Sequence, residues 1–268
     1  MEEPLRINGV DVLVEGDGET TIVMLHGWPD TCRLWDGQVE SLKGRFRCVR
    51  FTLPGFEIAQ PRAACSLAET IDLLLAVVDR VSPTRPVVLL LHDWGCFFGY
   101  QFAMREPGRV AKIVGVDIGD ARSPEYLQSL SLKAKAMTVA YQWWLALAWR
   151  LGGRLGDAMT RALARAAHAP ASPLSIHAGM NYPYDIRWTG SHGSYRSAVP
   201  FVPSWPMLFI YGSRKPFMFH SPQFAEALAV RADCRVLEFS TGHWVMTEEP
   251  RRFDDAVRAW LGKAERSS

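Results

Sequence analysis

The sequence lacks the patterns of several large classes of protein. Its five cysteines are odd in number and widely spaced, with no CxxC pair, so neither a disulfide framework nor a zinc site is indicated. The net charge is only +2 and the basic residues are scattered, which argues against nucleic acid as a partner. No apolar run reaches the roughly 20 residues that cross a bilayer, and the opening MEEPLRINGV lacks the apolar core of a signal peptide. We therefore expect a cytoplasmic protein with free thiols, no metal, no cofactor and no membrane partner.

What the sequence does contain is a series of short apolar runs, each followed by loop residues. The runs are rich in Val, Ile, Leu and Phe on consecutive positions, which is typical of strands buried on both faces of a parallel sheet. They cover residues 21–29, 46–55, 86–95, 110–120, 206–216 and 234–243. Ahead of them, LRINGVDVLVEGDG alternates around an Asn-Gly pair and predicts a β-hairpin.

Helical patterns separate the apolar runs. Ser66 with Glu69 three residues later forms a capping box at the start of one helix, and further helical stretches cover residues 96–107 and 250–264. Strands that alternate with helices predict a doubly wound α/β fold with a mostly parallel sheet.

One long segment interrupts this alternation. Residues 121–200 contain no convincing strand and are helix-like and aromatic, as in AYQWWLALAW. Such a segment is too long for a plain crossover between strands. We interpret residues 1–120 and 201–268 as two parts of one α/β core, with 121–200 as a helical cap over the carboxyl edge of the sheet, where open α/β sheets bind ligands.

A single carboxylate stands at the end of the third parallel run. In LLLHDWG, Asp93 lies where a buried strand passes into a helix, the context of a nucleophile elbow. The helix amino terminus favours an ionised carboxylate there, which can attack an electrophilic carbon and leave an ester on the enzyme. The alternative interpretation is that Asp93 only caps the helix, which is the commonest role of Asp before a helix.

Two further segments supply the groups that such a reaction needs. His243 follows the last apolar run in a Gly-His loop and can act as the base that activates water against the ester. The backbone N–H groups of Trp28, in LHGWP, and of Trp94 are the candidate oxyanion donors.

The stretches LHGWPDTCRLW, LHDWG and GHWVMTEEP resemble the epoxide hydrolase and haloalkane dehalogenase branch of the α/β-hydrolase superfamily. The resemblance covers about residues 20–120 and 205–260 and implies the α/β-hydrolase fold with a helical cap. It also implies Asp93 as nucleophile and His243 as base. The fold class expected is therefore α/β, with a doubly wound sheet and an inserted cap.

The cap residues separate the two activities of this branch. Epoxide hydrolases carry two cap tyrosines that protonate the epoxide oxygen, and Tyr141 in AYQWW and Tyr195 in GSYRSA have similar contexts. Tyr182 and Tyr184 are alternative candidates for the same role. Packing within the cap would by itself also account for an aromatic residue at position 141. Dehalogenases instead hold halide with indole N–H donors, a role open to Trp28 and Trp94. The tyrosines favour epoxide opening on a small apolar organic substrate.

The chain departs from the family pattern at the acid that orients the histidine. Many relatives place this acid after the strand that here reads PMLFIYG, but Lys215 stands there, and its charge is expected to lower the pKa of the histidine. Other relatives take the acid from the end of the preceding strand, which makes Asp117 the first candidate and Asp120 the second. Leu91, two residues before Asp93, replaces a usually small residue and is expected to crowd the elbow.

These departures keep other functions open. Dehalogenation uses the same Asp93 and His243, and a dioxygenase-like reaction needs only the histidine and its acid. A binding protein without activity is the alternative from another class, favoured by Lys215 and Leu91. A homodimer is the one protein partnership we expect.

Overall fold

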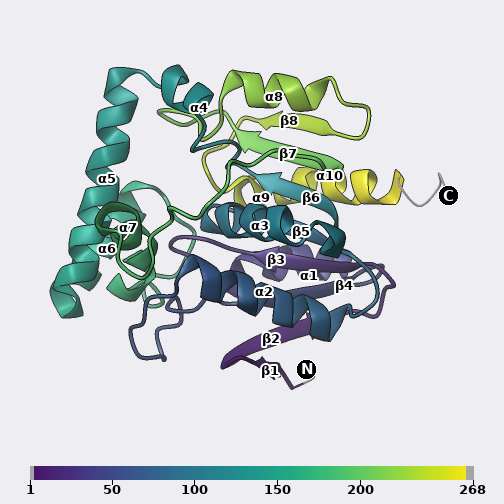
Figure 1. The fold of residues 1–268 in the computed structure, drawn as a ribbon, viewed down its shortest axis with the longest axis horizontal. Helices are drawn as coiled ribbons and strands as arrows, with labels where there is room; N and C mark the ends of the chain where they lie inside the picture. The colour runs from purple at the N-terminus through teal and green to yellow at the C-terminus, as the bar shows by residue number, and fades with distance from the viewer. Residues whose placement is uncertain (1–2, 264–268) are drawn as a thin grey trace.

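Eight strands form one sheet through the centre of the molecule (Figure 1). The computed structural model describes residues 3–263, and the ends of the two predicted core segments, residues 1–2 and 264–268, lie outside them. The spatial order is β1-β2-β4-β3-β5-β6-β7-β8, with β1 and β2 antiparallel and the others parallel. The strands are β1 (Leu5–Ile7), β2 (Val10–Glu15), β3 (Thr21–Leu25), β4 (Arg47–Phe51), β5 (Val87–His92), β6 (Val110–Val116), β7 (Met207–Gly212) and β8 (Arg235–Phe239).

The apolar runs and the hairpin predicted from the sequence are confirmed as these eight strands. The turn between β1 and β2 is the Asn8-Gly9 pair, and both residues have positive φ, which that short connection requires. Every residue of β3 and β5 is buried, because helices cover both faces of the parallel part of the sheet.

The helices of the core lie on the two faces of the sheet. In Figure 1, α2 and α3 lie in front of the strands, whereas α1 and α10 lie behind them. The capping box of Ser66 and Glu69 is present at the start of α2, as predicted. The core helices are η1 (Cys32–Trp35), α1 (Asp36–Leu42), α2 (Leu67–Val81), α3 (Trp94–Arg105), η2 (Pro107–Arg109), α8 (Pro222–Ala229), α9 (Val245–Glu248) and α10 (Pro250–Lys263).

A second group of helices lies between β6 and β7 in the sequence. It contains α4 (Pro124–Ser129), α5 (Leu132–Leu151), α6 (Gly153–Ala166), η3 (Ala178–Asn181) and α7 (Tyr182–Thr189). Figure 1 shows α5, α6 and α7 together at the end of the molecule toward which the parallel strands point. The carboxyl end of β5, where Asp93 stands, therefore faces these helices.

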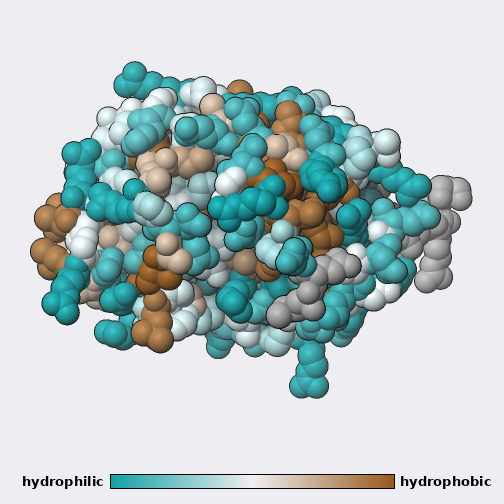
Figure 2. All heavy atoms as spheres, turned by 90° about the horizontal axis from the view of Figure 1, so that it is seen from below, coloured by the Kyte–Doolittle hydropathy of each residue, from teal (hydrophilic) through white to brown (hydrophobic). Residues whose placement is uncertain are grey.

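Large apolar side chains are exposed on this helical end. Trp143, Trp144, Leu147 and Leu151 of α5 and Leu155 of α6 are all exposed. In Figure 2 hydrophobic residues lie at the side where Figure 1 places α5 and α6, and others gather right of the middle of this face. Among residues 3–263, no helix is both long and apolar enough to span a membrane. The homodimer and the cytoplasmic location remain predictions.

Leu91 is accommodated beside the elbow by a glycine on the following helix. Its side chain is fully buried and lies against Gly99 of α3, where a Cβ would fall 2.5 Å from Leu91 Cδ2. The absence of a side chain at Gly99 provides the volume that the branched Leu91 needs, so the predicted crowding is relieved by α3.

We predict that Gly99→Ala destabilises the protein. The new methyl group forces Leu91 from its rotamer, and this overpacking outweighs the gain in helix propensity, for a net loss of about 1–2 kcal/mol in the free energy of unfolding. Urea unfolding followed by circular dichroism measures the change.

The control is Gly37→Ala in α1, where a Cβ meets nothing within 4 Å and no loss is expected. Combining Gly99→Ala with Leu91→Ala should cost less than the sum of the two single changes. Additive costs would show that the two positions do not compete for volume.

Candidate active site

Asp93 stands at a sharp turn between β5 and α3. Its φ of 51° and ψ of −123° lie outside the common regions for a residue with a side chain, as expected for a nucleophile elbow. The loop after β3 approaches this turn closely, since a Cβ on Gly27 would lie 2.3 Å from Asp93 Oδ1. Only glycine at position 27 allows this approach.

The two carboxylate oxygens of Asp93 have different partners. Oδ1 accepts a hydrogen bond of 2.6 Å from the backbone N–H of Trp28. Burial opposes ionisation of the Asp93 carboxyl, but His243, His92 and the backbone N–H of Trp94 together outweigh burial and lower its pKa. Oδ2 lies 3.5 Å from His243 Nε2. One oxygen therefore occupies the expected oxyanion site, and the other faces the histidine.

Asp117 at the end of β6 binds the other nitrogen of the histidine. Its Oδ2 accepts a short hydrogen bond from His243 Nδ1, and its Oδ1 accepts a bond of 3.0 Å from the backbone N–H of Gly212 on β7. His92 supports the same loop, with its Nε2 3.1 Å from the carbonyl oxygen of His243. The structure thus brings Asp93, His243 and Asp117 into one line of contacts.

Lys215 belongs to this line as well. Its ammonium group forms a short ion pair with Asp117 Oδ1, and its side chain is 6% exposed while that of Asp117 is fully buried. The lysine occupies the loop after β7 where an acid was expected, and it neutralises the acid that comes from β6 instead. Sequence reasoning identified the substitution but not this partner.

Asp120, the second candidate for the acid, is engaged elsewhere. Its oxygens accept hydrogen bonds from the backbone N–H of Ser221 at 2.7 Å and from the hydroxyls of Ser123 and Ser221, both at 2.6 Å. Asp120 therefore joins the loop after β6 to the start of α8, and it is Asp117 that reaches His243.

The charges in this line shift the pKa values of its members. Burial opposes ionisation of Asp117, but His243 and Lys215 outweigh it and lower the pKa to about 2. Burial likewise opposes the imidazolium, yet Asp117 and Asp93 raise the pKa of His243 to about 9. The net pKa of His243 is therefore raised, because the two carboxylates outweigh burial, and the lowering expected from Lys215 stays a prediction.

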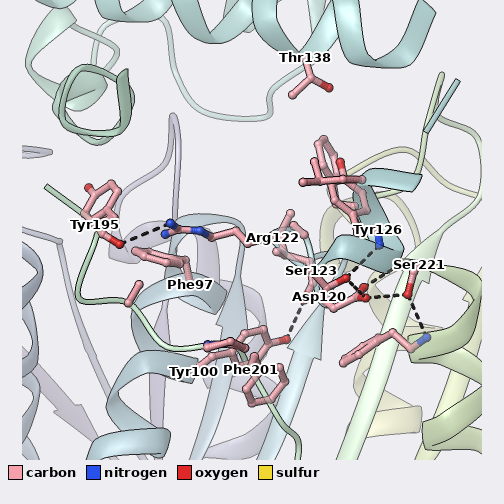
Figure 3. Close-up of a pocket in the computed structure, with 18 of the residues that line it drawn as sticks. Phe97, Tyr100, Asp120, Arg122, Ser123, Tyr126, Thr138, Tyr195, Phe201 and Ser221 are labelled. Carbon is pink, nitrogen blue, oxygen red and sulfur yellow. Dashed lines mark hydrogen bonds between the residues drawn. The ribbon is translucent and has the colours of Figure 1, made fainter. Parts of the chain in front are cut away.

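Three tyrosines surround the space in front of Asp93. Burial, together with the charge of Asp93, raises the pKa of both Tyr141 and Tyr184. Tyr195 is buried, its hydroxyl has no hydrogen-bond partner, and after burial the groups that act on its pKa are Cys65, Arg122 and Arg187. Tyr141 and Tyr184 thus lie within the field of the carboxylate. Figure 3 shows the Tyr195 hydroxyl directed away from Arg122.

One of the two indole N–H groups proposed as halide ligands, that of Trp28, is occupied. Trp28 Nε1 donates a hydrogen bond of 2.7 Å to Asn181 Oδ1, and the amide of Asn181 donates in turn to Thr160. The indole ring of Trp94 lies edge-on to Tyr184, with ring centroids 5.3 Å apart, and lines the cavity. In this arrangement the indole N–H of Trp28 is not free to bind an anion.

A cavity of about 790 Å³ opens between the elbow and the inserted helices. Asp93, Trp94, Tyr141, Tyr184 and Tyr195 line it together with mostly apolar residues, some of which Figure 3 shows. Among residues 3–263, no group of three or more His, Cys, Asp or Glu side chains is placed to hold a metal ion. The site therefore has a carboxylate, an imidazole and phenols as its reactive groups.

Comparison with known proteins agrees with this architecture. Residues 22–256 match the model of the alpha/beta hydrolase family, so the chain belongs to that family. An epoxide hydrolase of Bacillus megaterium has a TM-score of 0.70 at 18% identity over 97% of this chain and 100% of that one. The haloalkane dehalogenase DbeA of Bradyrhizobium elkanii has a TM-score of 0.64 at 17% identity over 98% and 96%. At these identities the likenesses show the fold.

Curated relatives match only part of the chain. The probable oxidoreductase EphD of Mycobacterium tuberculosis is 37% identical over 118 residues, which are 41% of this chain and 20% of that protein. A cis-3-alkyl-4-alkyloxetan-2-one decarboxylase of Xanthomonas campestris is 33% identical over 107 residues, 37% of this chain and 35% of that enzyme. The chain thus spans about a fifth of the first relative and about a third of the second.

We predict that Lys215→Met shifts the pH dependence of any reaction that needs neutral His243. Removing the cation leaves Asp117 free to stabilise the imidazolium more strongly, so the pKa of His243 rises. Activity that increases as His243 loses its proton should then appear about one pH unit higher. The pH profile of kcat measures this.

Lys215→Arg keeps the charge and should leave the profile in place. Both variants are compared as folded protein, since breaking a buried ion pair also destabilises the fold. An unchanged profile in Lys215→Met would remove Lys215 from the electrostatics of the site.

Proposed function

We propose that this protein opens epoxides to diols through a covalent ester on Asp93. The observation that carries the proposal is that the two oxygens of Asp93 have different partners: Oδ1 accepts a hydrogen bond from the backbone N–H of Trp28, Oδ2 lies near His243, and the residue lines the cavity. Tyr141 lines the same cavity and supplies an acid that epoxide opening requires.

In the first step, Asp93 Oδ2 attacks an epoxide carbon. The C–O bond of the ring breaks, and the ring oxygen takes a proton from a tyrosine hydroxyl, which leaves a tyrosinate and a hydroxyalkyl ester. Burial and Asp93 raise the pKa of Tyr141 to about 12, which remains well matched to a strongly basic alkoxide. A second tyrosine hydroxyl would hold the epoxide oxygen together with Tyr141. The candidates are Tyr195, which is favoured by its sequence context, and Tyr184, which is favoured by its contact with Trp94.

In the second step, His243 takes a proton from water, and hydroxide attacks the ester carbonyl. Oδ1 of Asp93 carries the negative charge that develops, and the backbone N–H of Trp28 is already directed at it. When this intermediate collapses, its hydroxyl proton passes to the leaving alkoxide, the diol is released and the carboxylate of Asp93 is restored, while His243 keeps the proton taken from water.

Esterification itself prepares His243 to act as the base. The charge of Asp93 contributes to the raised pKa of His243 in the free protein, so the resting imidazole holds a proton near neutral pH. Once Asp93 is an ester that charge is gone, and the pKa of His243 falls toward its ordinary value. The imidazolium then gives its proton to the tyrosinate formed in the first step, so that the imidazole is neutral when water must be activated.

Dehalogenation of an alkyl halide is the second candidate, because it uses the same Asp93 and His243 and occurs on the same fold. The occupied indole of Trp28 and the presence of Tyr141 in the cavity favour epoxide opening over it. A small apolar substrate, the absence of a cofactor, a cytoplasmic location and a homodimer complete the proposal.

We predict that His243→Gln accumulates an ester on Asp93. Attack still proceeds but water is no longer activated, so intact-protein mass spectrometry should show an increase equal to the mass of the epoxide. Styrene oxide and longer terminal epoxides serve as the panel.

Asp93→Ala should reduce turnover to the uncatalysed rate, and the double variant should show no adduct. Absence of an adduct from every epoxide in His243→Gln, with the protein folded, would falsify the covalent mechanism.

We predict that Tyr141→Phe lowers kcat/KM for epoxides by about a hundredfold, the usual contribution of a general acid. Tyr184→Phe and Tyr195→Phe identify the second hydroxyl by the same measurement. Tyr182→Phe is the matched control, since this buried tyrosine does not line the cavity.

Release of bromide from an alkyl bromide should be unaffected by Tyr141→Phe, because halide needs no acid. Equal losses on both substrates would instead assign Tyr141 a structural role.

A further inference from the structure

The outer face of α5 is apolar, although the outer face of a helix that only covers a core is usually polar. The inner face of α5 is also apolar and includes the buried Leu145, Ala146 and Ala148. On the opposite face, large apolar side chains recur at spacings of four and seven residues, which place them on one side of the helix. They are 43–85% exposed: Leu132, Val139, Trp143, Leu147 and Leu151.

The apolar surface continues onto the neighbouring helix. Trp144 is exposed and donates a hydrogen bond of 3.0 Å from Nε1 to the carbonyl oxygen of Met159 on α6, and Leu155 of α6 is exposed as well. Figure 1 shows α5 along the outer end of the inserted helices, and in Figure 2 hydrophobic residues lie at that side. The outer apolar face comprises Leu132, Val139, Trp143, Trp144, Leu147, Leu151 and Leu155.

The charges beside the outer apolar face are almost all positive. α5 contains basic residues and no acidic one, and the single acidic residue of α6, Asp157, accepts a hydrogen bond of 2.8 Å from the backbone N–H of Ala178. Arg150 is paired with Asp185 of α7. Among residues 3–263, four exposed cations of α5 and α6 form no ion pair with a carboxylate: Lys133, Lys135, Arg154 and Arg165.

These cations belong to an asymmetry of charge along the whole chain. Residues 121–200 contain nine Lys and Arg but only three Asp and Glu, whereas the rest of the chain contains 21 and 25. The inserted segment is therefore positive and the core is negative, although the net charge of the chain is only +2. In the field of an anionic surface, such a molecule turns its inserted helices toward that surface.

Apolarity and charge together distinguish between the possible occupants of this face. A second copy of the chain would bring two positively charged segments together, and like charges repel. An anionic bilayer surface offers negative headgroups beside an apolar acyl boundary. Tryptophan, which the face presents at positions 143 and 144, suits that boundary because its ring is apolar and its N–H is polar.

We propose that the outer apolar face docks on the surface of an anionic lipid bilayer, with α5 lying in the plane of the membrane. The 20 residues of α5 provide a contact about 30 Å long. The expectation of no membrane partner rested on the absence of a spanning run, and a helix that lies on the surface needs none. The proposal goes beyond the proposed reaction and does not depend on it.

The same face borders the cavity in front of Asp93. Val139 is exposed on α5 and also lines the cavity. Trp143 packs against Trp188, another residue of the cavity wall, with ring centroids 5.4 Å apart. A protein docked through α5 therefore holds its cavity beside the bilayer, where apolar molecules accumulate.

The first experiment sediments the protein with vesicles of equal parts phosphatidylcholine and phosphatidylglycerol. The wild-type protein should bind these vesicles at low salt, and bind less at high salt or to phosphatidylcholine alone. Leu147→Gln combined with Leu151→Gln should lower the partition coefficient at least about tenfold, because both side chains then lose their burial in the acyl boundary. Val230→Gln, an exposed apolar residue at the end of α8 in the core, is the matched control and should leave binding unchanged.

Lys133→Gln and Arg154→Gln test the contribution of charge. Each should weaken binding to the anionic vesicles about fivefold, the usual contribution of one basic residue near an anionic surface. Arg235→Gln makes the same charge change on the exposed start of β8 in the core and should leave binding in place.

Trp143→Phe tests the orientation of the docked protein. Brominated acyl chains quench the fluorescence of tryptophans that reach them, so quenching should be weaker in Trp143→Phe than in the wild-type protein. Trp260→Phe on α10 is the control and should be quenched as the wild-type protein is.

The outcomes decide the proposal once circular dichroism has shown that each variant is folded. A wild-type protein that does not sediment with anionic vesicles overturns it, and so does binding that survives both leucine changes or is equal on neutral vesicles. A dimer in analytical ultracentrifugation that the leucine changes dissociate, without vesicle binding, would show that a second copy covers the face and would overturn it as well.

Discussion

The carboxylate of Asp117 is the interaction on which the site depends. It is fully buried, and each of its oxygens serves a different partner: one binds His243, and the other binds Lys215 and the backbone of Gly212. A buried charge is costly unless it is paired and hydrogen-bonded, and these contacts supply both. Because Asp117 follows β6 while Lys215 follows β7 and His243 follows β8, the same carboxylate also ties together three neighbouring loops at the carboxyl edge of the sheet.

The parallel sheet makes this arrangement possible. The carboxyl ends of β3, β5, β6, β7 and β8 all open on one edge, so short loops from distant parts of the sequence meet there. Gly27 lets one of these loops contact the elbow. Gly99 on α3 leaves space for the side chain of Leu91, which lies on the strand before the elbow. The strained backbone of Asp93 is thus supported from several sides, which is the condition under which such strain persists.

The electrostatics of the edge divide into two regions. Near the sheet, Asp93, Asp117, His243 and Lys215 alternate in charge and nearly cancel one another. Toward the inserted helices, the wall of the cavity carries both signs of charge, with Arg122, Lys135 and Arg187 beside Asp120 and Glu125.

The sequence by itself determined the strands, the hairpin turn and the helix that starts at the Ser66 capping box, because apolar periodicity and turn residues act locally. It also indicated Asp93 and His243 as candidates, since a strand–turn–helix context and a Gly-His loop are local patterns. Only the tertiary structure decided that Asp117 rather than Asp120 reaches His243, that Lys215 pairs with Asp117, and that the indole N–H of Trp28 is bonded to Asn181 inside the protein. These are contacts between residues far apart in the chain, and they depend on the direction of each side chain after the sheet has assembled, which no local pattern encodes.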